Sequence, residues 1–283
     1  MSARIITKRE LIPGMTSLMV LYSPHIASKA KPGNFLIMRV HAQGERIPLT
    51  IADADPAAGT ITIVFLVVGK TTARLNLLHE GDVIPDVCGP LGKPTHIEQK
   101  GNVICVGGGT GVAAMYHIAK GHYLAGNTVT AVIGARTKAL LLFHAELSRF
   151  CSEVMVATND GSMGVQGLVT DALRERLARG PEVAEVVAVG PVPMMQAVAE
   201  VTRPLGIKTT VSLNTIMVDG IGMCGACRCT VDGEMRFACV DGPEFDAHKV
   251  DFSELRKRLE QFHGQERADL ERFKQQFGTG GGN

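Results

Sequence analysis

The feature that most constrains the fold is a regular alternation of strand and helix patterns in the middle of the chain. Short apolar, β-branched runs are separated by longer stretches in which apolar residues recur at helical spacing. Strands that alternate with helices of this length indicate a parallel, doubly wound α/β sheet. We expect strands at 102–106, 128–133, 153–158 and 183–189, and helices at 112–124, 140–150, 168–177 and 193–204.

The first of these strands runs into a glycine-rich turn, Gly107-Gly108-Gly109-Thr110-Gly111. Such a turn before a helix lets backbone N–H groups approach a pyrophosphate, and the helix N-terminus adds a favourable dipole. Gly109-x-Gly111-x-x-Ala114 also fits the dinucleotide fingerprint, although plain strand-to-helix turns are glycine-rich as well. Where an acidic residue is expected, the next strand ends in Arg136, which suits a 2′-phosphate or stacks on adenine. NADP(H) therefore stays open beside NAD(H).

A second turn, Gly190-Pro191-Val192-Pro193-Met194-Met195, follows the strand at 183–189. Its plainest role is to start the next helix, because proline is favoured in a first helical turn. Ligands of doubly wound sheets collect at the carboxyl edge of the sheet. We therefore expect Gly190, Pro191 and Met194 to lie against the nicotinamide.

Before residue 98 the pattern is different and predicts an antiparallel β-barrel. Short alternating runs such as 35–40, 60–68 and 82–87 are separated by turn residues. The chain has 283 residues, of which 45% are apolar, so it is long enough for two or three compact units with hydrophobic cores. The 29 basic and 28 acidic residues nearly balance, which argues against nucleic-acid or membrane partners. Because we find neither a secretory signal nor a membrane-spanning run, we expect a cytoplasmic protein.

Four of the seven cysteines crowd into a short glycine-rich stretch near residue 230 and predict a metal centre. Against the plant-type spacing C-x₄-C-x₂-C…C of [2Fe–2S] proteins, the last three ligands fall on Cys224, Cys227 and Cys239. The first ligand falls on Asp219. The alternative is a structural zinc site that uses Cys229 together with those three cysteines.

With these motifs the chain resembles the ferredoxin-NADP reductase-like flavoprotein subunits typified by the electron-transfer subunit of dihydroorotate dehydrogenase. It is more similar still to the small subunits of NADH-dependent reduced ferredoxin:NADP oxidoreductases and sulfide dehydrogenases. The resemblance implies that the barrel binds FAD. It also implies that the loop with Asp160 lies near the bound nucleotide. The segments that resemble the FAD motifs contribute Arg46, Pro48, Leu49, Thr50, Phe65, Leu66, Val67, Gly69, Thr71, Thr72 and Gly89.

The resemblance also concerns the cluster and the path of the electrons. The bifurcating small subunits resemble this chain in having an aspartate at the position of Asp219, where the relatives that serve dihydroorotate oxidation have cysteine. The resemblance therefore implies a [2Fe–2S] cluster with one aspartate and three cysteine ligands. Electrons would pass between NAD(H), FAD and this cluster, and on to a larger subunit with flavin and [4Fe–4S] centres, through which ferredoxin would react. No catalytic acid or base is needed, because the cofactors carry the chemistry. A dihydroorotate dehydrogenase subunit and a nucleotide-binding regulator with zinc stay open as alternatives.

We therefore expect four parts along the chain. They are an FAD-binding barrel at 1–98, an NAD(P)-binding α/β domain at 99–210, a small iron–sulfur segment at 211–250, and a C-terminal part at 251–283. The C-terminal part is predicted to be one amphipathic helix, 251–277, and a flexible tail.

Overall fold

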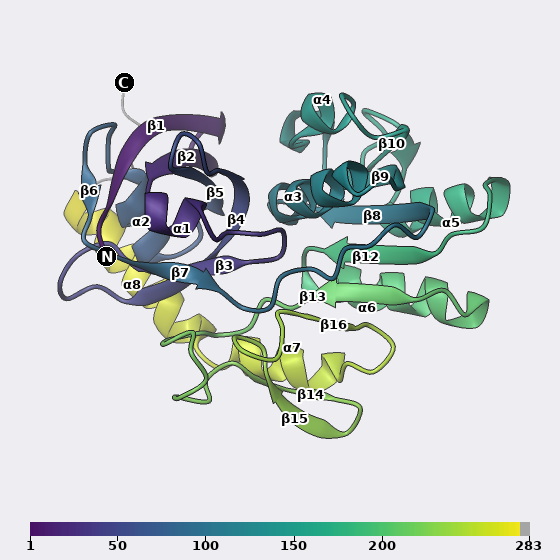
Figure 1. The fold of residues 1–283 in the computed structure, drawn as a ribbon. Helices are drawn as coiled ribbons and strands as arrows, with labels where there is room; N and C mark the ends of the chain where they lie inside the picture. The colour runs from purple at the N-terminus through teal and green to yellow at the C-terminus, as the bar shows by residue number, and fades with distance from the viewer. Residues whose placement is uncertain (278–283) are drawn as a thin grey trace.

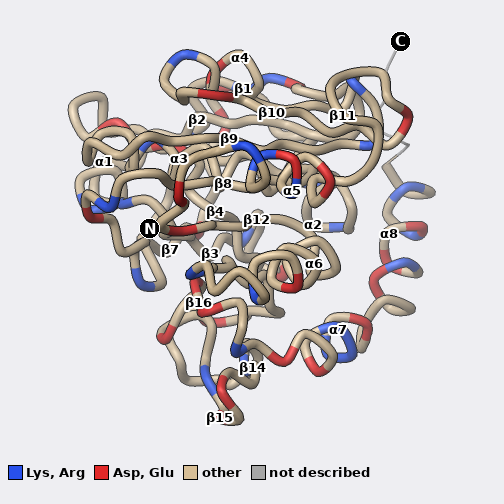
Figure 2. Tube along the Cα trace, turned by 90° about the vertical axis from the view of Figure 1, so that its right-hand side faces the viewer, with Lys and Arg blue, Asp and Glu red and all other residues tan. Residues whose placement is uncertain are grey.

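The computed structural model describes residues 1–277, so the predicted tail 278–283 lies outside the described residues. Figure 1 shows three units: a β-barrel, an α/β domain beside it, and a smaller C-terminal unit below both. Basic and acidic residues are interspersed along the trace in Figure 2. Among residues 1–277, no helix combines the length and the apolar character that crossing a membrane requires.

The barrel is a seven-stranded antiparallel sheet with the strand order β6-β1-β2-β5-β4-β3-β7. It nearly closes, because the Val87 N–H donates to the Met1 carbonyl at 2.6 Å. The predicted strand at 82–87 is divided by Pro85, which cannot donate a ladder hydrogen bond. Its elements are β1 (Ala3–Ile12), β2 (Thr16–Tyr22), α1 (Pro24–Ala27), β3 (Phe35–Arg39), β4 (Arg46–Asp55), β5 (Thr60–Leu66), α2 (Lys70–Asn76), β6 (Val83–Ile84) and β7 (Asp86–Leu91).

The second sheet has the order β11-β10-β9-β8-β12-β13-β16 and is parallel except for β16. The chain moves outward from β8 through β9 to β10 and then crosses to β12, so the order reverses between β8 and β12. Its strands are β8 (Asn102–Gly108), β9 (Thr128–Ala135), β10 (Glu153–Thr158), β11 (Val165–Gln166), β12 (Glu185–Val189), β13 (Thr209–Ser212) and β16 (Glu244–Asp246). The helices are α3 (Gly111–Leu124), α4 (His144–Leu147), α5 (Val169–Arg179) and α6 (Val192–Thr202), with 3₁₀ turns at Lys138–Leu140 and Arg203–Leu205.

The predicted helix at 140–150 is wrong. Only a 3₁₀ turn and the four-residue α4 form there. Phe143, which directly precedes α4, has a φ of 56°, and a side chain other than glycine in this left-handed region interrupts a helix. Leu142 and Leu147 are nevertheless buried against the sheet, so the apolar spacing reflects packing of an irregular segment.

The C-terminal unit begins with a long loop and contains the hairpin of β14 (Arg228–Val231) and β15 (Glu234–Phe237). The single helix predicted at 251–277 is two helices, α7 (Phe252–Glu260) and α8 (His263–Phe277). The helix is interrupted because its halves pack on different partners: α7 on α6 and β14, and α8 on α2 of the barrel.

Contacts between the barrel and the α/β domain run along α3. The Lys120 ammonium lies 2.9 Å from both carboxylate oxygens of Asp53, and His117 Nδ1 lies 2.9 Å from the Ile51 carbonyl oxygen. Burial lowers the pKa of His117, so its ring is neutral in this interface. The residues Phe35 and Ile37 of the barrel also share one apolar core with the α/β domain and the C-terminal unit. These contacts hold together the barrel and the α/β domain, whose facing surfaces form the walls of the candidate site.

Candidate functional site

The two predicted glycine turns meet at the point where the strand order of the α/β sheet reverses. They follow β8 and β12, which pair in parallel so that Gly107 lies opposite Val189. A Cβ atom on Gly111 would lie 2.5 Å from the Val189 carbonyl oxygen and 2.7 Å from the Gly190 Cα. Only glycine allows this approach. In open α/β sheets this switch point at the carboxyl edge is where ligands bind.

A cavity of about 470 Å³ opens on one side of these turns. The α/β domain contributes the glycine turn, Arg136 and the helix start at Pro191–Met194, and the barrel contributes Ile12, Met15 and Leu66. The described lining contains one basic residue, Arg136, and no acidic residue. We call this space the nucleotide cavity, because its wall of glycine backbone and apolar side chains suits a dinucleotide.

A second cavity of about 460 Å³ lies between the barrel and the same turns. Its barrel wall includes Ile47–Thr50 from β4, Val64–Leu66 from β5, and Thr72 from α2. Its far wall contains Asn214 and Met217 from the loop that leads to the cysteines. We call it the flavin cavity. The two cavities share part of their lining, namely Leu66, Gly108, Gly109, Thr110 and Pro191.

Most of the residues predicted to bind cofactors line one of these cavities, but a minority do not. The lining of the two cavities includes Pro48, Leu49, Thr50, Phe65, Leu66, Thr72, Gly108, Gly109, Thr110, Gly111, Arg136, Gly190, Pro191 and Met194. The residues outside both linings are Arg46, Val67, Gly69, Thr71, Gly89 and Asp160. Thr71 is turned away, since its hydroxyl donates to Glu45 Oε2 at 2.6 Å. The Asp160 carboxylate accepts from the Ser162 hydroxyl and N–H, which lower its pKa.

The loop with Asp219 packs against the barrel beside the flavin cavity. A Cβ on Gly220 would lie 2.7 Å from Ile37 Cγ1 and from Leu91 Cδ1, so glycine lets the loop approach β3 and β7 closely. The Asp219 carboxylate accepts from the N–H groups of Ile221 at 3.0 Å and Cys224 at 2.7 Å. These backbone donors lower the pKa of Asp219 and keep it an anion.

Two of the predicted thiol ligands are adjacent. Cys227 Sγ lies 3.2 Å from Cys239 Sγ, and both residues are buried. Burial raises the pKa of Cys239 to about 12, with a further contribution from the hydrogen bond to Cys227. Cys229 is also buried, but it lies within β14 with its Sγ 3.8 Å from the Arg236 carbonyl oxygen of β15. Among residues 1–277, no three His, Cys, Asp or Glu side chains are gathered as a single metal ion requires.

The predictions omitted several lining residues that come from distant parts of the chain. Ile12, Met15 and Thr16 of the barrel line the nucleotide cavity, and Ser212, Leu213 and Asn214 line the flavin cavity. The latter three stand at the carboxyl end of β13, so the carboxyl-edge rule indicates them once β13 is known. No sequence signal indicates the β1–β2 turn.

Two family models match the chain. An oxidoreductase NAD-binding domain matches residues 105–200, which include the wall of the nucleotide cavity. The iron–sulfur cluster binding domain of dihydroorotate dehydrogenase B matches residues 214–251, which include Asp219 and the four clustered cysteines. The second match favours an iron–sulfur cluster over zinc.

Similar proteins extend over nearly the whole chain. A Thermotoga maritima homologue of the electron-transfer subunit of dihydroorotate dehydrogenase B (NAD(+)) is 51% identical over 253 residues, which are 89% of each chain. The chain belongs to the dihydroorotate dehydrogenase B electron-transfer subunit family. The Bacillus caldolyticus subunit of this family is 36% identical over 256 residues, covering 87% of this chain and 96% of its own.

A solved structure of this kind is also similar. A chain of the NADH-dependent reduced ferredoxin-NADP oxidoreductase, studied for flavin-based electron bifurcation, matches with a TM-score of 0.91 and 48% identity, over 96% of this chain and 97% of that chain. The protein is therefore an oxidoreductase subunit of the electron-transfer type, with NAD-binding and iron–sulfur-binding domains. Its cofactors are NAD(H), FAD and an iron–sulfur cluster, and it works with a larger partner subunit.

The described residues fit these groups. Gly111 leaves no room for a side chain where a pyrophosphate approaches the helix start. The flavin cavity is largely apolar with a few polar groups, among them Thr50 and Asn214, as cofactor sites usually are. The segment 219–239 offers four thiols and the Asp219 carboxylate anion, and such groups are suitable iron ligands.

Proposed function

We propose that this chain passes electrons between NAD(H) and a larger flavin and [4Fe–4S] partner subunit, by way of FAD and a [2Fe–2S] cluster. The observation that carries the proposal is that the candidate nucleotide, flavin and cluster sites adjoin one another. The nucleotide and flavin cavities share a wall at the switch point. The flavin cavity is also lined by Asn214 and Met217 of the loop that leads to the cysteines, which we call the cluster loop. The domain boundaries at residues 98, 210 and 250 are part of this proposal.

Each cavity wall has its own task in the proposed mechanism. The backbone of Gly108–Gly111 binds pyrophosphate, and Pro191 and Met194 orient the nicotinamide toward the shared wall. Pro48, Leu49 and Thr50 hold one edge of the flavin, and Phe65 excludes water from beside it. Arg136 meets the adenosine end of the nucleotide, where its charge also accommodates the 2′-phosphate of NADP(H).

The proposed cluster ligands are Asp219, Cys224, Cys227 and Cys239. When bound, the flavin exchanges electrons with the nucleotide as pairs and with the cluster singly, so the chain joins two-electron and one-electron chemistry. The backbone donors to Asp219 keep it ionised and aimed into the loop. Cys229, which is buried in β14, is proposed not to be a ligand.

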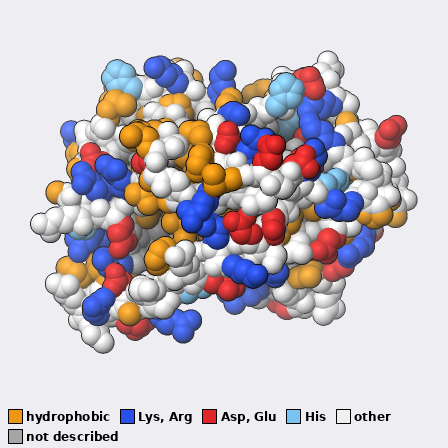
Figure 3. Space-filling model, turned by 90° about the horizontal axis from the view of Figure 1, so that it is seen from below, with side chains coloured by type: hydrophobic (Ala, Val, Ile, Leu, Met, Phe, Trp, Pro, Cys, Tyr) orange, Lys and Arg blue, Asp and Glu red, His pale blue; other side chains and the backbone are white. Residues whose placement is uncertain are grey.

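The partner surface is proposed to lie around the cluster loop. Figure 3 views the lower face of the molecule, where hydrophobic side chains gather in its left half. Large apolar side chains beside the predicted ligands are exposed: Val218, Ile221, Met223 and Val240, with Met223 82% exposed. Exposed apolar groups of this kind mark interaction sites. A partner that covers them would exchange electrons directly with the cluster, and ferredoxin would react through that partner.

The test is a visible and EPR spectrum of the purified chain, recorded before and after anaerobic addition of NADH. We expect flavin absorbance that is bleached by NADH and an EPR signal of a reduced [2Fe–2S] cluster. A protein prepared anoxically with iron that contained zinc and no flavin would refute the proposal.

A second candidate partner is the catalytic subunit of a dihydroorotate dehydrogenase, which the names of the relatives favour. The aspartate at position 219 argues against it, because the resemblance places cysteine there in subunits that serve dihydroorotate oxidation. Co-purification with a dihydroorotate dehydrogenase, and NAD⁺ reduction by dihydroorotate, would establish this candidate instead.

A further inference from the structure

The last two helices connect the iron–sulfur unit with the flavin barrel. Figure 1 shows them in yellow, α7 beside the lower unit and α8 reaching back to the barrel. They lie outside both matched family ranges, 105–200 and 214–251. The Bacillus caldolyticus subunit is covered over 96% of its length by only 87% of this chain, so this chain has residues without a counterpart there. Neither family model therefore accounts for the helix pair.

One end of the pair is anchored next to the cysteines. A guanidinium nitrogen of Arg258 in α7 donates to the carbonyl of Ala226, at 3.2 Å, between Cys224 and Cys227. The Glu254 carboxylate accepts from the Thr230 N–H of β14 at 3.1 Å. Phe252 and Leu255 are buried in the core of this unit, so α7 is fixed to the cysteine turn.

The other end rests on α2 of the barrel through two aromatic rings. Phe273 is 6% exposed, and its ring centroid lies 4.7 Å from that of Phe277. The Arg74 guanidinium of α2 lies 5.5 and 5.2 Å from these two centroids, within the range of cation–π attraction. Arg74 Nε is buried and has no hydrogen-bond partner among residues 1–277. The rings therefore contact a guanidinium whose Nε has no polar partner among these residues.

Ion pairs extend the contact to a second barrel segment. Lys70 Nζ lies 3.3 Å from Asp269 Oδ2 of α8 and 3.5 Å from Glu45 Oε1. Thr71 of α2 also donates to Glu45, which directly precedes β4. Ile47–Thr50 of β4, which begin two residues after Glu45, and Val68 and Thr72 around the start of α2 line the flavin cavity. Asp269 therefore holds α8 to Lys70 of α2, and Lys70 in turn pairs with Glu45 beside the second segment of the flavin-cavity wall.

We propose that α8 is a positioning strap, in which Asp269 and Phe273 act through Lys70 and Arg74 to hold the flavin-cavity wall in place. Because Arg258 of the preceding helix α7 donates to the cysteine turn, α7 and the strap together join this wall to that turn. The inference rests on the proposed flavin site. None of these strap residues lines the flavin cavity, so their effect on FAD is indirect.

The test compares full-length Asp269→Asn and Phe273→Ala with Glu271→Gln, a control on the same helix. The Glu271 carboxylate pairs only with Lys274 of α8, at 3.3 Å, among the described contacts. FAD release is followed as flavin fluorescence after dilution, and hydrogen exchange is measured at 45–50 and 68–76. We expect release about two- to fivefold faster for Asp269→Asn and about tenfold faster for Phe273→Ala, with faster exchange in both segments.

The control should behave as the wild type, and the EPR signal of the cluster should be present in all variants. If the wild type holds FAD and both variants release it at the wild-type rate with unchanged exchange, the strap is refuted while the flavin site stands. If the wild type holds no FAD, the flavin site and the strap's proposed role fail together. Asp269→Asn removes the partly exposed ion pair with Lys70, together with a pair to Arg272 on the same helix, and keeps the test valid should Phe273→Ala fail to fold.

Discussion

The Cβ position of Gly111 lies 2.5 Å from the carbonyl oxygen of Val189, so the start of α3 and the end of β12 are in direct backbone contact. Gly111→Ala must push these two segments apart, because neither contact atom belongs to a flexible side chain. We expect a loss of about 1–3 kcal/mol in the free energy of unfolding and loss of bound FAD and NADH. Urea unfolding and the flavin absorbance after gel filtration measure the two effects.

Gly264→Ala is the matched control for this substitution. Gly264 lies in α8, and nothing lies within 4 Å of its Cβ position. Alanine there should stabilise the protein by about 0.5–1 kcal/mol, because it favours the helix. Equal cofactor content in the two variants would contradict a ligand-binding role for the glycine turn.

The ligand set of the cluster is tested by Asp219→Ala and Cys229→Ser. If Asp219 is a ligand, its removal should change the visible spectrum and speed the loss of iron to a chelator by at least about tenfold. Cys229→Ser should retain iron, since Cys229 lies within β14 and faces the Arg236 carbonyl. Unchanged iron and spectrum in Asp219→Ala, with loss of both in Cys229→Ser, would assign the fourth ligand to Cys229.

The sequence indicates those parts of the site whose residues lie together in one short stretch of the chain. The turns at 107–111 and 190–195 each follow a strand, and the parallel pairing of β8 and β12 brings them together, as the carboxyl-edge rule requires. The cysteine spacing is likewise contained in one loop. The barrel and the doubly wound sheet follow from hydrophobic periodicity, which is strong in long segments.

The remaining features depend on contacts between distant residues, which no local pattern encodes. Met15 lines the nucleotide cavity only because the barrel stands against the carboxyl edge of the other sheet. The interruption between α7 and α8 follows from the separate partners of the two helices, as the contact of Arg74 with Phe273 illustrates. The short α4 follows from a left-handed residue, Phe143, in a segment whose apolar spacing suggests a longer helix.

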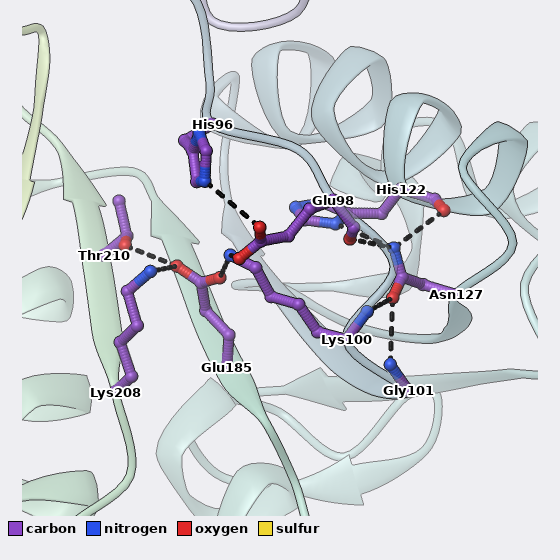
Figure 4. A network of polar contacts seen from close by, with 9 residues as sticks. All are labelled: His96, Glu98, Lys100, Gly101, His122, Asn127, Glu185, Lys208 and Thr210. Atoms are coloured by element: carbon purple, nitrogen blue, oxygen red, sulfur yellow. Dashed lines mark hydrogen bonds and ion pairs between the residues drawn. The ribbon is translucent and has the colours of Figure 1, made fainter.

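A buried ion pair joins the amino ends of β8 and β12, at the sheet edge opposite the ligand cavities. Lys100 Nζ lies 2.6 Å from Glu185 Oε2, and their side chains are 11% and 5% exposed. Lys208 Nζ lies 3.3 Å from the other Glu185 oxygen, which also accepts from Thr210, as Figure 4 shows. Lys100→Met should destabilise the protein by about 3 kcal/mol, because it leaves a buried carboxylate short of a partner.

Lys208→Met is the control, since the Lys208 side chain is 59% exposed and its pair with Glu185 is screened by water. We expect a change below about 1 kcal/mol in urea unfolding. The cofactor content should be unaffected in both variants, because this network lies away from the two cavities. Equal destabilisation by the two substitutions would show that burial of Lys100 does not strengthen its pair.

Glu244 lies where the three units meet, and its ionisation should make the free energy of unfolding depend on pH. Its Oε1 accepts from the Thr95 hydroxyl at 2.6 Å and lies 3.0 Å from the Cβ position of Gly33. Burial raises the pKa of Glu244 from 4.5 to about 7, and the hydrogen bond from Thr95 opposes this shift only in part. The folded protein therefore binds this proton more tightly than the unfolded chain does.

Because of this difference, stability should fall as the pH rises from about 4.5 to about 7 and then level off, by up to about 3 kcal/mol from this group. Glu244→Gln keeps a side-chain carbonyl for Thr95 but cannot ionise. It should match the wild type near pH 4.5 and be more stable than the wild type at pH 8. Urea unfolding at both pH values measures the difference, with the exposed Asp246→Asn on the same strand as the control. A constant difference between Glu244→Gln and the wild type at both pH values would mean that the pKa of Glu244 is the same in the folded and the unfolded chain, and that water reaches the carboxylate in the junction.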